Sequence, residues 1–219
     1  MPDSFPDTLH MPDGARYSAR YPMAMAYAAM KHAAQSRKDP QGSPYIGHPV
    51  AVSIHVWCYF DEQLHGADVA EDLAIAALLH DVAEDAGGQA ALNEVAAVFG
   101  ERVAQIVDHC SDALPAPGEA KDPWRQRKLA HIERVRVLAD PAAEQSDPGT
   151  CLVIACDKLH NLGQTAQDYS AQGEASLARF RGGVEGTRWY YRTLRDVLEP
   201  SLPQELVAAL DEPLRIIGA

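Results

Sequence analysis

The segment that most constrains this chain is residues 68–85, with the sequence DVAEDLAIAALLHDVAED. Its alanine and leucine content is typical of a helix, and two glycines at positions 87 and 88 predict where the helix ends. Every side chain from Leu73 to Leu79 is apolar, so this part of the helix has no face that favours water. We therefore expect the chain to surround this helix with other elements.

The other elements also have helical patterns, separated by the turn-rich stretches RKDPQGSPYIGHP at 37–49 and LPAPG at 114–118. We find no alternating strand pattern, internal repeat or low-complexity segment. The predicted helices span residues 21–36, 49–60, 68–85, 91–113 with a joint at Gly100, 121–139 with Pro123 in the first turn, 149–173, 174–199 and 203–213. The sequence thus predicts an all-α fold, with a single domain over residues 15–219 behind a flexible N-terminal arm at 1–14.

The charge of the chain limits its partners. Its 219 residues include 31 acidic and 19 basic side chains, which gives a net charge of −12. Such a surface repels nucleic acid and anionic lipid, so we expect no nucleic-acid partner, and a phosphate ligand needs a local basic patch. No stretch reaches the roughly 20 uncharged apolar residues of a membrane span, and the N-terminus lacks the pattern of a signal peptide. We expect a cytoplasmic protein with no membrane partner.

The four cysteines do not indicate a metal knuckle or a disulfide framework. They are Cys58, Cys110, Cys151 and Cys156. None has CxxC spacing, and most lie inside apolar runs. We expect them to be reduced and buried, where a thiol behaves as a small hydrophobic group.

Four ionisable residues follow the apolar run, and on a helix they share one face. They are His80, Asp81, Glu84 and Asp85. At 100° per residue, positions 80 and 84 lie about 40° apart, positions 81 and 85 likewise, and all four fall within an arc of about 140°. Ionisable groups beside so apolar a run are costly to bury unless something compensates for their charge, and a divalent cation does so.

Two further residues occupy similarly unusual places. His48 lies where the loop YIGHPV passes into a helix, and Asp157 follows CLVIAC, which we expect in the core. Together with His80 and Asp81 they offer two imidazoles and two carboxylates. This mixed shell of nitrogen and oxygen suits Mn²⁺ or Fe²⁺ better than a thiolate zinc site, and it leaves positions open for water and substrate.

The order of these motifs resembles a known family. The pattern H…HD…D, with HDVAED at its centre, RKDPQGSPYIGHP upstream and DKLHNL downstream, is similar to the HD-domain hydrolases of the RelA/SpoT alarmone family, specifically the small stand-alone group of metazoan SpoT homologues. The resemblance covers roughly residues 20–195. It implies an HD-domain helical bundle that uses Mn²⁺ to hydrolyse the 3′-pyrophosphate of guanosine tetra- or pentaphosphate, releasing GDP or GTP and pyrophosphate.

The resemblance also implies roles for individual residues. The metal ligands would be His48, His80, Asp81 and Asp157. Glu84 and Asp85 would position or deprotonate the attacking water. The chemistry agrees, because a metal lowers the pKa of bound water and a nearby carboxylate can take the proton.

The substrate-binding residues are predicted from the same motifs. Asn161 lies one helical turn after Asp157 and matches a position that faces the nucleotide. Arg37 and Lys38 match a basic pair that holds the base or the phosphates, although both also suit a helix C-terminus. Tyr45 is a weaker candidate for the pocket wall. Arg127 and Lys128 belong to a helix with six cations and are proposed as a phosphate attractor, with a solvated helix face as the alternative.

The chain departs from the family at one point and leaves other functions open. Gly163 and Gln164 follow HNL where the family often has a basic residue and then a small hydroxyl or acidic one, which puts the ligand contacts there in doubt. Only about 20 residues follow Arg195, so we expect no synthetase activity. The alternatives are a phosphohydrolase for another nucleotide ester, such as a nucleoside monophosphate or the 2′-phosphate of NADPH, and a non-catalytic alarmone sensor. The HDVAED motif and the upstream loop favour the alarmone hydrolase, and the intact ligand set argues against the sensor.

The sequence leaves the oligomeric state open, and a toxic synthetase is a predicted functional counterpart. The other histidines, which lack a partner set in the sequence, are expected to be structural or surface residues: His32, His55, His65, His109, His131 and His160. The aromatic stretch RWYYR at 188–192 is expected to face the core.

Overall fold

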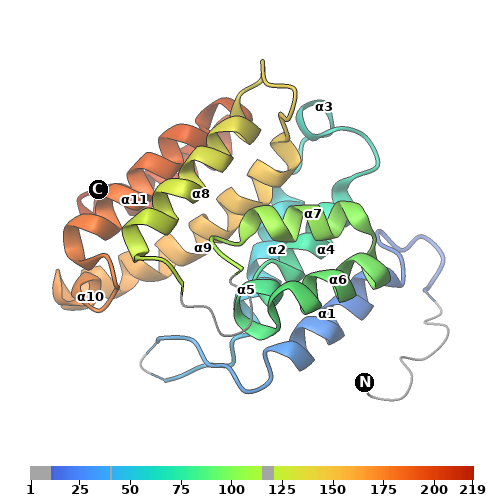
Figure 1. Cartoon of the computed structure of the whole chain (residues 1–219), viewed down its shortest axis with the longest axis horizontal. Helices are drawn as coiled ribbons and strands as arrows, with labels where there is room; N and C mark the ends of the chain where they lie inside the picture. The colour runs from blue at the N-terminus through green and yellow to red at the C-terminus, as the bar shows by residue number, and fades with distance from the viewer. Residues whose placement is uncertain (1–10, 40, 115–120) are drawn as a thin grey trace.

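The computed structural model describes residues 11–39, 41–114 and 121–219, and within them the chain is helical (Figure 1). Those residues contain no strand, only an isolated bridge between Ser36 and Pro44. The predicted all-α fold is confirmed. The first ten residues of the predicted N-terminal arm lie outside the described residues, and residues 11–14 form an exposed turn.

The N-terminal half contains seven helices within its described residues: α1 (Arg20–Lys31), α2 (Gly47–Tyr59), α3 (Glu62–His65), α4 (Ala70–Leu79), α5 (Val82–Ala86), α6 (Gly88–Phe99) and α7 (Glu101–Cys110). The described C-terminal part continues with α8 (Trp124–Ala139), α9 (Pro148–Gln172), α10 (Ala175–Ala178), α11 (Gly183–Leu198), the 3₁₀ turn η1 (Glu199–Ser201) and α12 (Gln204–Ile217). No described helix is both long enough and apolar enough to span a bilayer.

The apolar helix α4 lies at the centre of the N-terminal half. Every side chain from Leu73 to Leu79 is fully buried, and α4 packs against α1, α2, α7 and α9. Burying one leucine side chain contributes roughly 2 kcal/mol, so this seven-residue run is a major source of stability. The end of α4 is thereby held in a fixed position, and the polar residues that follow it are placed in the interior.

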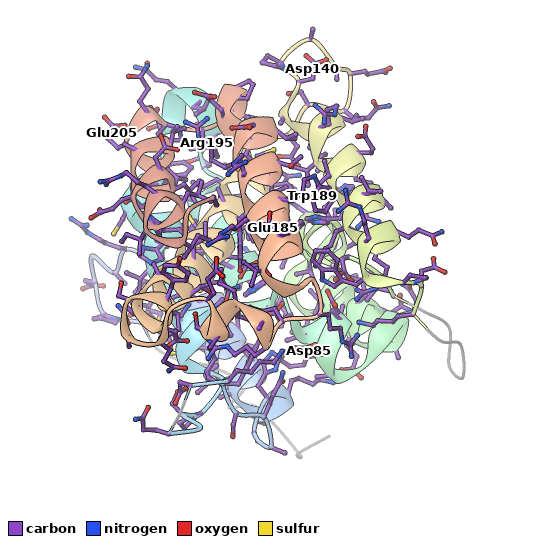
Figure 2. The ribbon with its side chains drawn as sticks, turned by 90° about the vertical axis from the view of Figure 1, so that its left-hand side faces the viewer. Asp85, Asp140, Glu185, Trp189, Arg195 and Glu205 are labelled. Carbon is purple, nitrogen blue, oxygen red and sulfur yellow. The ribbon has the colours of Figure 1, made fainter. Side chains whose placement is uncertain are left out.

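The C-terminal helices α8, α11 and α12 pack along the long helix α9 (Figure 1). Figure 2 shows Trp189 of α11 beside α8, where its ring contacts Trp124 and lies under the guanidinium of Arg125. Trp124 also lies against Gly182, where an added Cβ atom would come within 2.6 Å of the indole. Tyr190 of the RWYYR stretch is buried, as expected, while Trp189 and Tyr191 are half-buried.

Two predicted helix ends were wrong. The first helix ends at Lys31 and not near Ser36, because Gln35 and Tyr45 pair through their backbones and turn the chain back on itself. The last helix continues past Pro213 to Ile217. Its apolar face, which includes buried Leu210 and Ile217, packs on α9 and outweighs the loss of one backbone hydrogen bond.

The predicted helix over residues 68–85 is interrupted where His80 and Asp81 form a turn between α4 and α5. The ring Nδ1 of His80 bonds to the carbonyl of Ala77 at 2.8 Å. In a regular helix that carbonyl accepts the N–H of Asp81, so the ring competes with the backbone.

All four cysteines are free thiols, as expected, but they are not all buried. Cys151 and Cys156 lie in the core, Cys110 is half-buried and Cys58 is exposed. Cys58 lies on the outer face of α2, whose inner face carries buried Val52 and Val56.

Candidate metal centre and adjoining cavity

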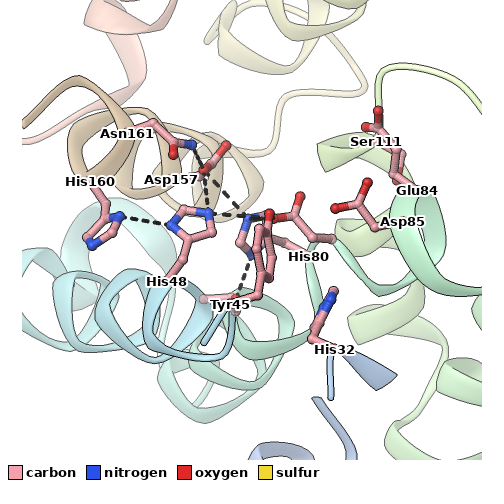
Figure 3. A network of polar contacts seen from close by, with 12 residues as sticks. His32, Tyr45, His48, His80, Glu84, Asp85, Ser111, Asp157, His160 and Asn161 are labelled. Carbon is pink, nitrogen blue, oxygen red and sulfur yellow. Dashed lines mark hydrogen bonds and ion pairs between the residues drawn. The ribbon is translucent and has the colours of Figure 1, made fainter. Parts of the chain in front are cut away.

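Four predicted ligands from three separate segments converge at one point, and Figure 3 labels three of them, His48, His80 and Asp157. His48 comes from α2, Asp157 from α9, and His80 and Asp81 from the turn after α4. The Nε2 atom of His48 lies 3.1 Å from an oxygen of Asp157 and 3.5 Å from one of Asp81. The Nε2 atom of His80 lies 3.0 Å from Asp81 and 3.6 Å from Asp157. The structure thus brings together all four residues that the sequence predicted as ligands.

The two histidines present their Nε2 atoms to this point because their Nδ1 atoms are occupied elsewhere. Nδ1 of His80 bonds to the carbonyl of Ala77, which accepts only, so this nitrogen carries the proton and Nε2 has a free lone pair. Nδ1 of His48 lies 2.9 Å from Nδ1 of His160. Both Nε2 atoms are buried, and within the described part of the chain neither has a hydrogen-bond partner.

This donor set fits a divalent cation. The ligand atoms of His48, His80 and Asp157 all lie within 4.8 Å of one another, and the three side chains are buried. Burial lowers the pKa of His80, but the negative charges of Asp81 and Asp157 beside its ring raise it well above the usual value. A second proton on the His80 ring therefore offsets part of the charge of the two aspartates when no cation is bound. Two partnerless nitrogens beside two carboxylates are the arrangement that a cation satisfies.

Three polar side chains connect the ligands to their surroundings. The hydroxyl of Tyr45 donates to Asp81 at 2.5 Å, and burial together with that carboxylate raises the pKa of the hydroxyl, so it remains protonated. The amide of Asn161 donates to Asp157 at 2.5 Å. Lys158 donates to the other oxygen of Asp157 at 2.5 Å. Burial lowers the pKa of Lys158, but Asp157 raises it well above the usual value and keeps the ammonium charged.

A cavity of about 440 Å³ adjoins the metal centre, because Tyr45, Lys158 and Asn161 line it and also bond to the ligands. Its basic lining residues are Arg37, Lys38, Lys128, Lys158 and Arg179, and its acidic ones are Asp39, Asp85 and Asp168. The aromatic lining residues are Tyr45, Trp124, Phe180, Tyr190 and Tyr191. In a chain with a net charge of −12, this is a local basic site with flat apolar surfaces.

Arg37 and Lys38, which the sequence predicted to bind substrate, lie in the loop between α1 and α2 and line this cavity. The guanidinium of Arg37 donates to Asn161 at 3.0 Å and lies over the Tyr45 ring, 5.6 Å from its centroid. Segments more than 100 positions apart in the chain therefore form one wall.

The two predicted water-handling carboxylates have different surroundings. Asp85 lines the cavity and accepts a hydrogen bond from Gln35 at 2.8 Å. Glu84 does not line it and is held by the backbone N–H of Asp112 and by Lys121. Burial raises the pKa of Glu84, and the charge of Asp112 raises it further.

The two predicted substrate-binding cations of α8, Arg127 and Lys128, also have different surroundings. Lys128 lines the cavity, bonds to Asp112 and lies 4.8 Å from the centroid of the Tyr190 ring. Arg127 is buried and forms an ion pair with Asp112 at 2.5 Å, and it is absent from the cavity wall. Its charge compensates a buried carboxylate.

Sequence reasoning missed several residues of this site, of which Lys158 and His160 contact the metal ligands directly. Lys158 stands next to the ligand Asp157 at the end of an apolar run, where a cation needs a buried partner, and that position was a usable signal. His160 was expected to be structural or at the surface, but it bonds to the ligand His48. No local pattern indicates a contact between residues 112 positions apart.

The comparison with family models agrees with this geometry. The model for the HD domain matches residues 24–180, which is more than half of the chain. The chain therefore belongs to the HD-domain family.

Several characterised proteins are similar to it. The human guanosine-3′,5′-bis(diphosphate) 3′-pyrophosphohydrolase MESH1 is 36% identical over 140 residues, which is 64% of this chain and 65% of the human protein. The Drosophila melanogaster MESH1 is 33% identical over 145 residues, covering 66% of this chain and 69% of that protein. The aligned region thus spans slightly less than two thirds of the human relative.

One solved structure covers nearly the whole fold. It belongs to a metazoan orthologue of SpoT that hydrolyses ppGpp, and it superposes with a TM-score of 0.66 at 27% identity. The match covers 94% of this chain and 97% of that one. The HD-domain helical fold is therefore shared beyond the region matched by the family model.

Proposed function

We propose that this protein is a metal-dependent guanosine-3′,5′-bis(diphosphate) 3′-pyrophosphohydrolase that acts in the cytoplasm. The observation that carries the proposal is the convergence of two partnerless Nε2 atoms and two carboxylates at the edge of a basic cavity with aromatic walls. A cation site beside a cationic cavity suits a phosphorylated nucleotide. The names of the similar proteins support the choice of ppGpp among such nucleotides.

His48, His80, Asp81 and Asp157 hold the cation in this proposal, which we assign as Mn²⁺ with Fe²⁺ as the alternative. When bound, such a cation lowers the pKa of a water ligand and polarises a phosphoryl oxygen. Tyr45 and Asn161 orient the two aspartates through their hydrogen bonds. Both side chains are neutral, so they do not change the total charge around the cation.

In this proposal, the carboxylates of Glu84 and Asp85 act on the attacking water. Asp85, at the cavity wall, takes a proton from the water. Glu84 lies behind Asp85 and supports its role as the base. Attack at the phosphorus joined to the 3′ oxygen breaks that O–P bond, the 3′ oxygen gains a proton, and GDP or GTP leaves with pyrophosphate. Lys158 lines the cavity, where it can neutralise charge on the pyrophosphate group under attack.

The remaining cavity residues bind the nucleotide. Arg37 and Lys38 hold the base or the 5′-phosphates, with Tyr45 as a wall of the same pocket. Lys128 attracts phosphate directly, and Arg127 contributes its charge from behind while it anchors Asp112. Gln164 lines the same cavity, and we include it among the nucleotide-binding residues of this proposal.

The direct test is to incubate the purified chain with ppGpp, with and without Mn²⁺, and to separate the products. We expect GDP and pyrophosphate in equal amounts, no turnover after chelation and recovery when Mn²⁺ is added. Release of orthophosphate from NADPH or a nucleoside monophosphate, without attack on ppGpp, would instead support a phosphohydrolase for another nucleotide ester. Binding of ppGpp without any turnover would support a sensor. A toxic synthetase as functional counterpart stays a prediction.

A further inference from the structure

The hydrogen bond between His48 and His160 connects the metal centre to a residue outside it (Figure 3). The two Nδ1 atoms are 2.9 Å apart, and His48 is only 1% exposed. We propose that His160 is a positioning residue, which fixes the tautomer and ring orientation of His48 and so sets the affinity of the centre for its cation. The inference rests on the metal centre of the proposed function, but not on the identity of the substrate.

The placement of protons carries the argument. Two Nδ1 atoms at this distance form a hydrogen bond only if one of them carries a proton and the other does not. A cation on Nε2 of His48 uses the lone pair there, so the proton of the neutral ring lies on Nδ1. His48 then donates and His160 accepts. With His160 as the acceptor, the bond holds His48 in the tautomer that ligates through Nε2.

The two histidine ligands differ in how they are anchored. His80 bonds to the backbone carbonyl of Ala77, which no side-chain substitution removes. His48 depends on a side chain, because His160 is its recorded Nδ1 partner among the described residues. The rings of His48 and His160 also pack together, with centroids 4.8 Å apart. A substitution at His160 can therefore change the orientation of His48 without replacing a metal ligand.

The surroundings of His160 permit such a change. Its ring borders a second cavity of about 510 Å³ between α2, α9 and α12, on a different side of α9 from the basic cavity. His55 borders the same cavity, with its ring centroid 6.4 Å from that of His160, and it has no hydrogen bond to a ligand among the described contacts. A phenylalanine at position 160 therefore has space, and His55→Phe is a matched control.

The first experiment measures Mn²⁺ affinity, with free Mn²⁺ followed by electron paramagnetic resonance. His160→Phe removes the acceptor, and we expect its Kd to rise about 10–100-fold. His160→Asn keeps an oxygen near the position of Nδ1, so its Kd should lie closer to that of the wild type. His55→Phe should bind as the wild type does. Thermal unfolding of the metal-free proteins checks that each variant is folded.

The second experiment reads the tautomer of His48 by long-range ¹⁵N–¹H imidazole spectra with diamagnetic Zn²⁺ bound. We expect a protected Nδ1 proton on His48 in the wild type and its loss in His160→Phe. Equal Mn²⁺ affinity and an equally protected proton in His160→Phe would overturn the inference while leaving the metal centre intact. A wild-type protein that binds no Mn²⁺ would overturn the metal centre itself, and the inference with it.

Discussion

At the scale of single residues, the site separates side chains that the sequence places side by side. Glu84 and Asp85 are neighbours, but only Asp85 lines the cavity, while Glu84 points to Asp112 and Lys121. The same holds for Arg127 and Lys128 on α8. Adjacent positions on a helix differ by 100° in direction, so two neighbours rarely share one environment. This geometry gives two predictions.

The first prediction concerns Asp85. Replacing it by asparagine removes a proton acceptor and keeps the shape, so kcat for ppGpp should fall by about 10²- to 10⁴-fold. The Kd for Mn²⁺ should stay unchanged because Asp85 lies in the cavity wall, bonds to Gln35 and is not one of the four proposed ligands. Steady-state kinetics and metal titration check both. Asp39→Asn is the control, since Asp39 lines the same cavity but bonds within its own loop. An unchanged kcat in Asp85→Asn would remove Asp85 from the reaction.

The second prediction separates Arg127 from Lys128. Arg127→Met leaves the buried carboxylate of Asp112 with less compensation, and we expect a loss of roughly 3–5 kcal/mol in the free energy of unfolding. Lys128→Met should instead raise KM for ppGpp and change stability much less. Urea unfolding and steady-state kinetics of both variants test this. The reverse pattern would show that Arg127 meets substrate and Lys128 serves the fold.

At the scale of elements, the site depends on how α9 begins. Asp147 is the N-cap of α9: it accepts a hydrogen bond from the N–H of Thr150 at 3.0 Å and forms two bonds with Arg102 of α7. This cap fixes the start of the helix that carries Asp157, Lys158 and His160. Burial raises the pKa of Asp147, but the bonds from Arg102 and Thr150 lower it to about 2.

The third prediction follows from that pKa. The folded value lies below the ordinary 3.8, so the stabilisation is complete above about pH 4 and is lost as pH falls toward 2. Asp147→Asn should therefore lower the free energy of unfolding by about 2 kcal/mol near neutral pH, with a difference that shrinks between pH 4 and pH 2. Urea unfolding across this range measures it. Asp140→Asn is the control, because Asp140 is exposed. A difference in unfolding free energy between the wild type and Asp147→Asn that does not vary with pH would contradict the assigned ion pair.

At the scale of the whole molecule, the metal centre joins three helices that also pack on one another. Its ligands come from α2, from the turn after α4 and from α9, so a bound cation connects three helices of the core. A ligand that binds only the folded state stabilises it, by about 2.7 kcal/mol when present at 100 times its Kd. The cation should therefore contribute to stability as well as to catalysis.

The fourth prediction is a fall in Tm when the cation is removed. At that degree of saturation, chelation should lower Tm by roughly 5–10 °C for a protein of this size, with recovery when Mn²⁺ is returned. Differential scanning calorimetry measures the change. His80→Ala should show no Mn²⁺-dependent change in Tm, because it lacks a ligand. An equal shift in that variant would place the stabilising cation elsewhere.

The sequence alone determined the class of fold and the chemical types at the site. An apolar run from Leu73 to Leu79 can be satisfied only inside a helical core, and His48, His80, Asp81 and Asp157 stand out because ionisable groups next to apolar runs need compensation. These are local properties, set by periodicity and by the cost of burial. The HD-domain assignment follows from the same motifs.

Only the tertiary structure decided which atoms meet. The pairing of Arg127 with Asp112, the place of Lys158 in the cavity wall and the contact of His160 with His48 all depend on how helices cross. Residues 112 positions apart come within hydrogen-bond distance because α2 and α9 pack on a common core. A sequence pattern records the direction of a side chain on its own helix, but the distance between two helices depends on the packing of all the others.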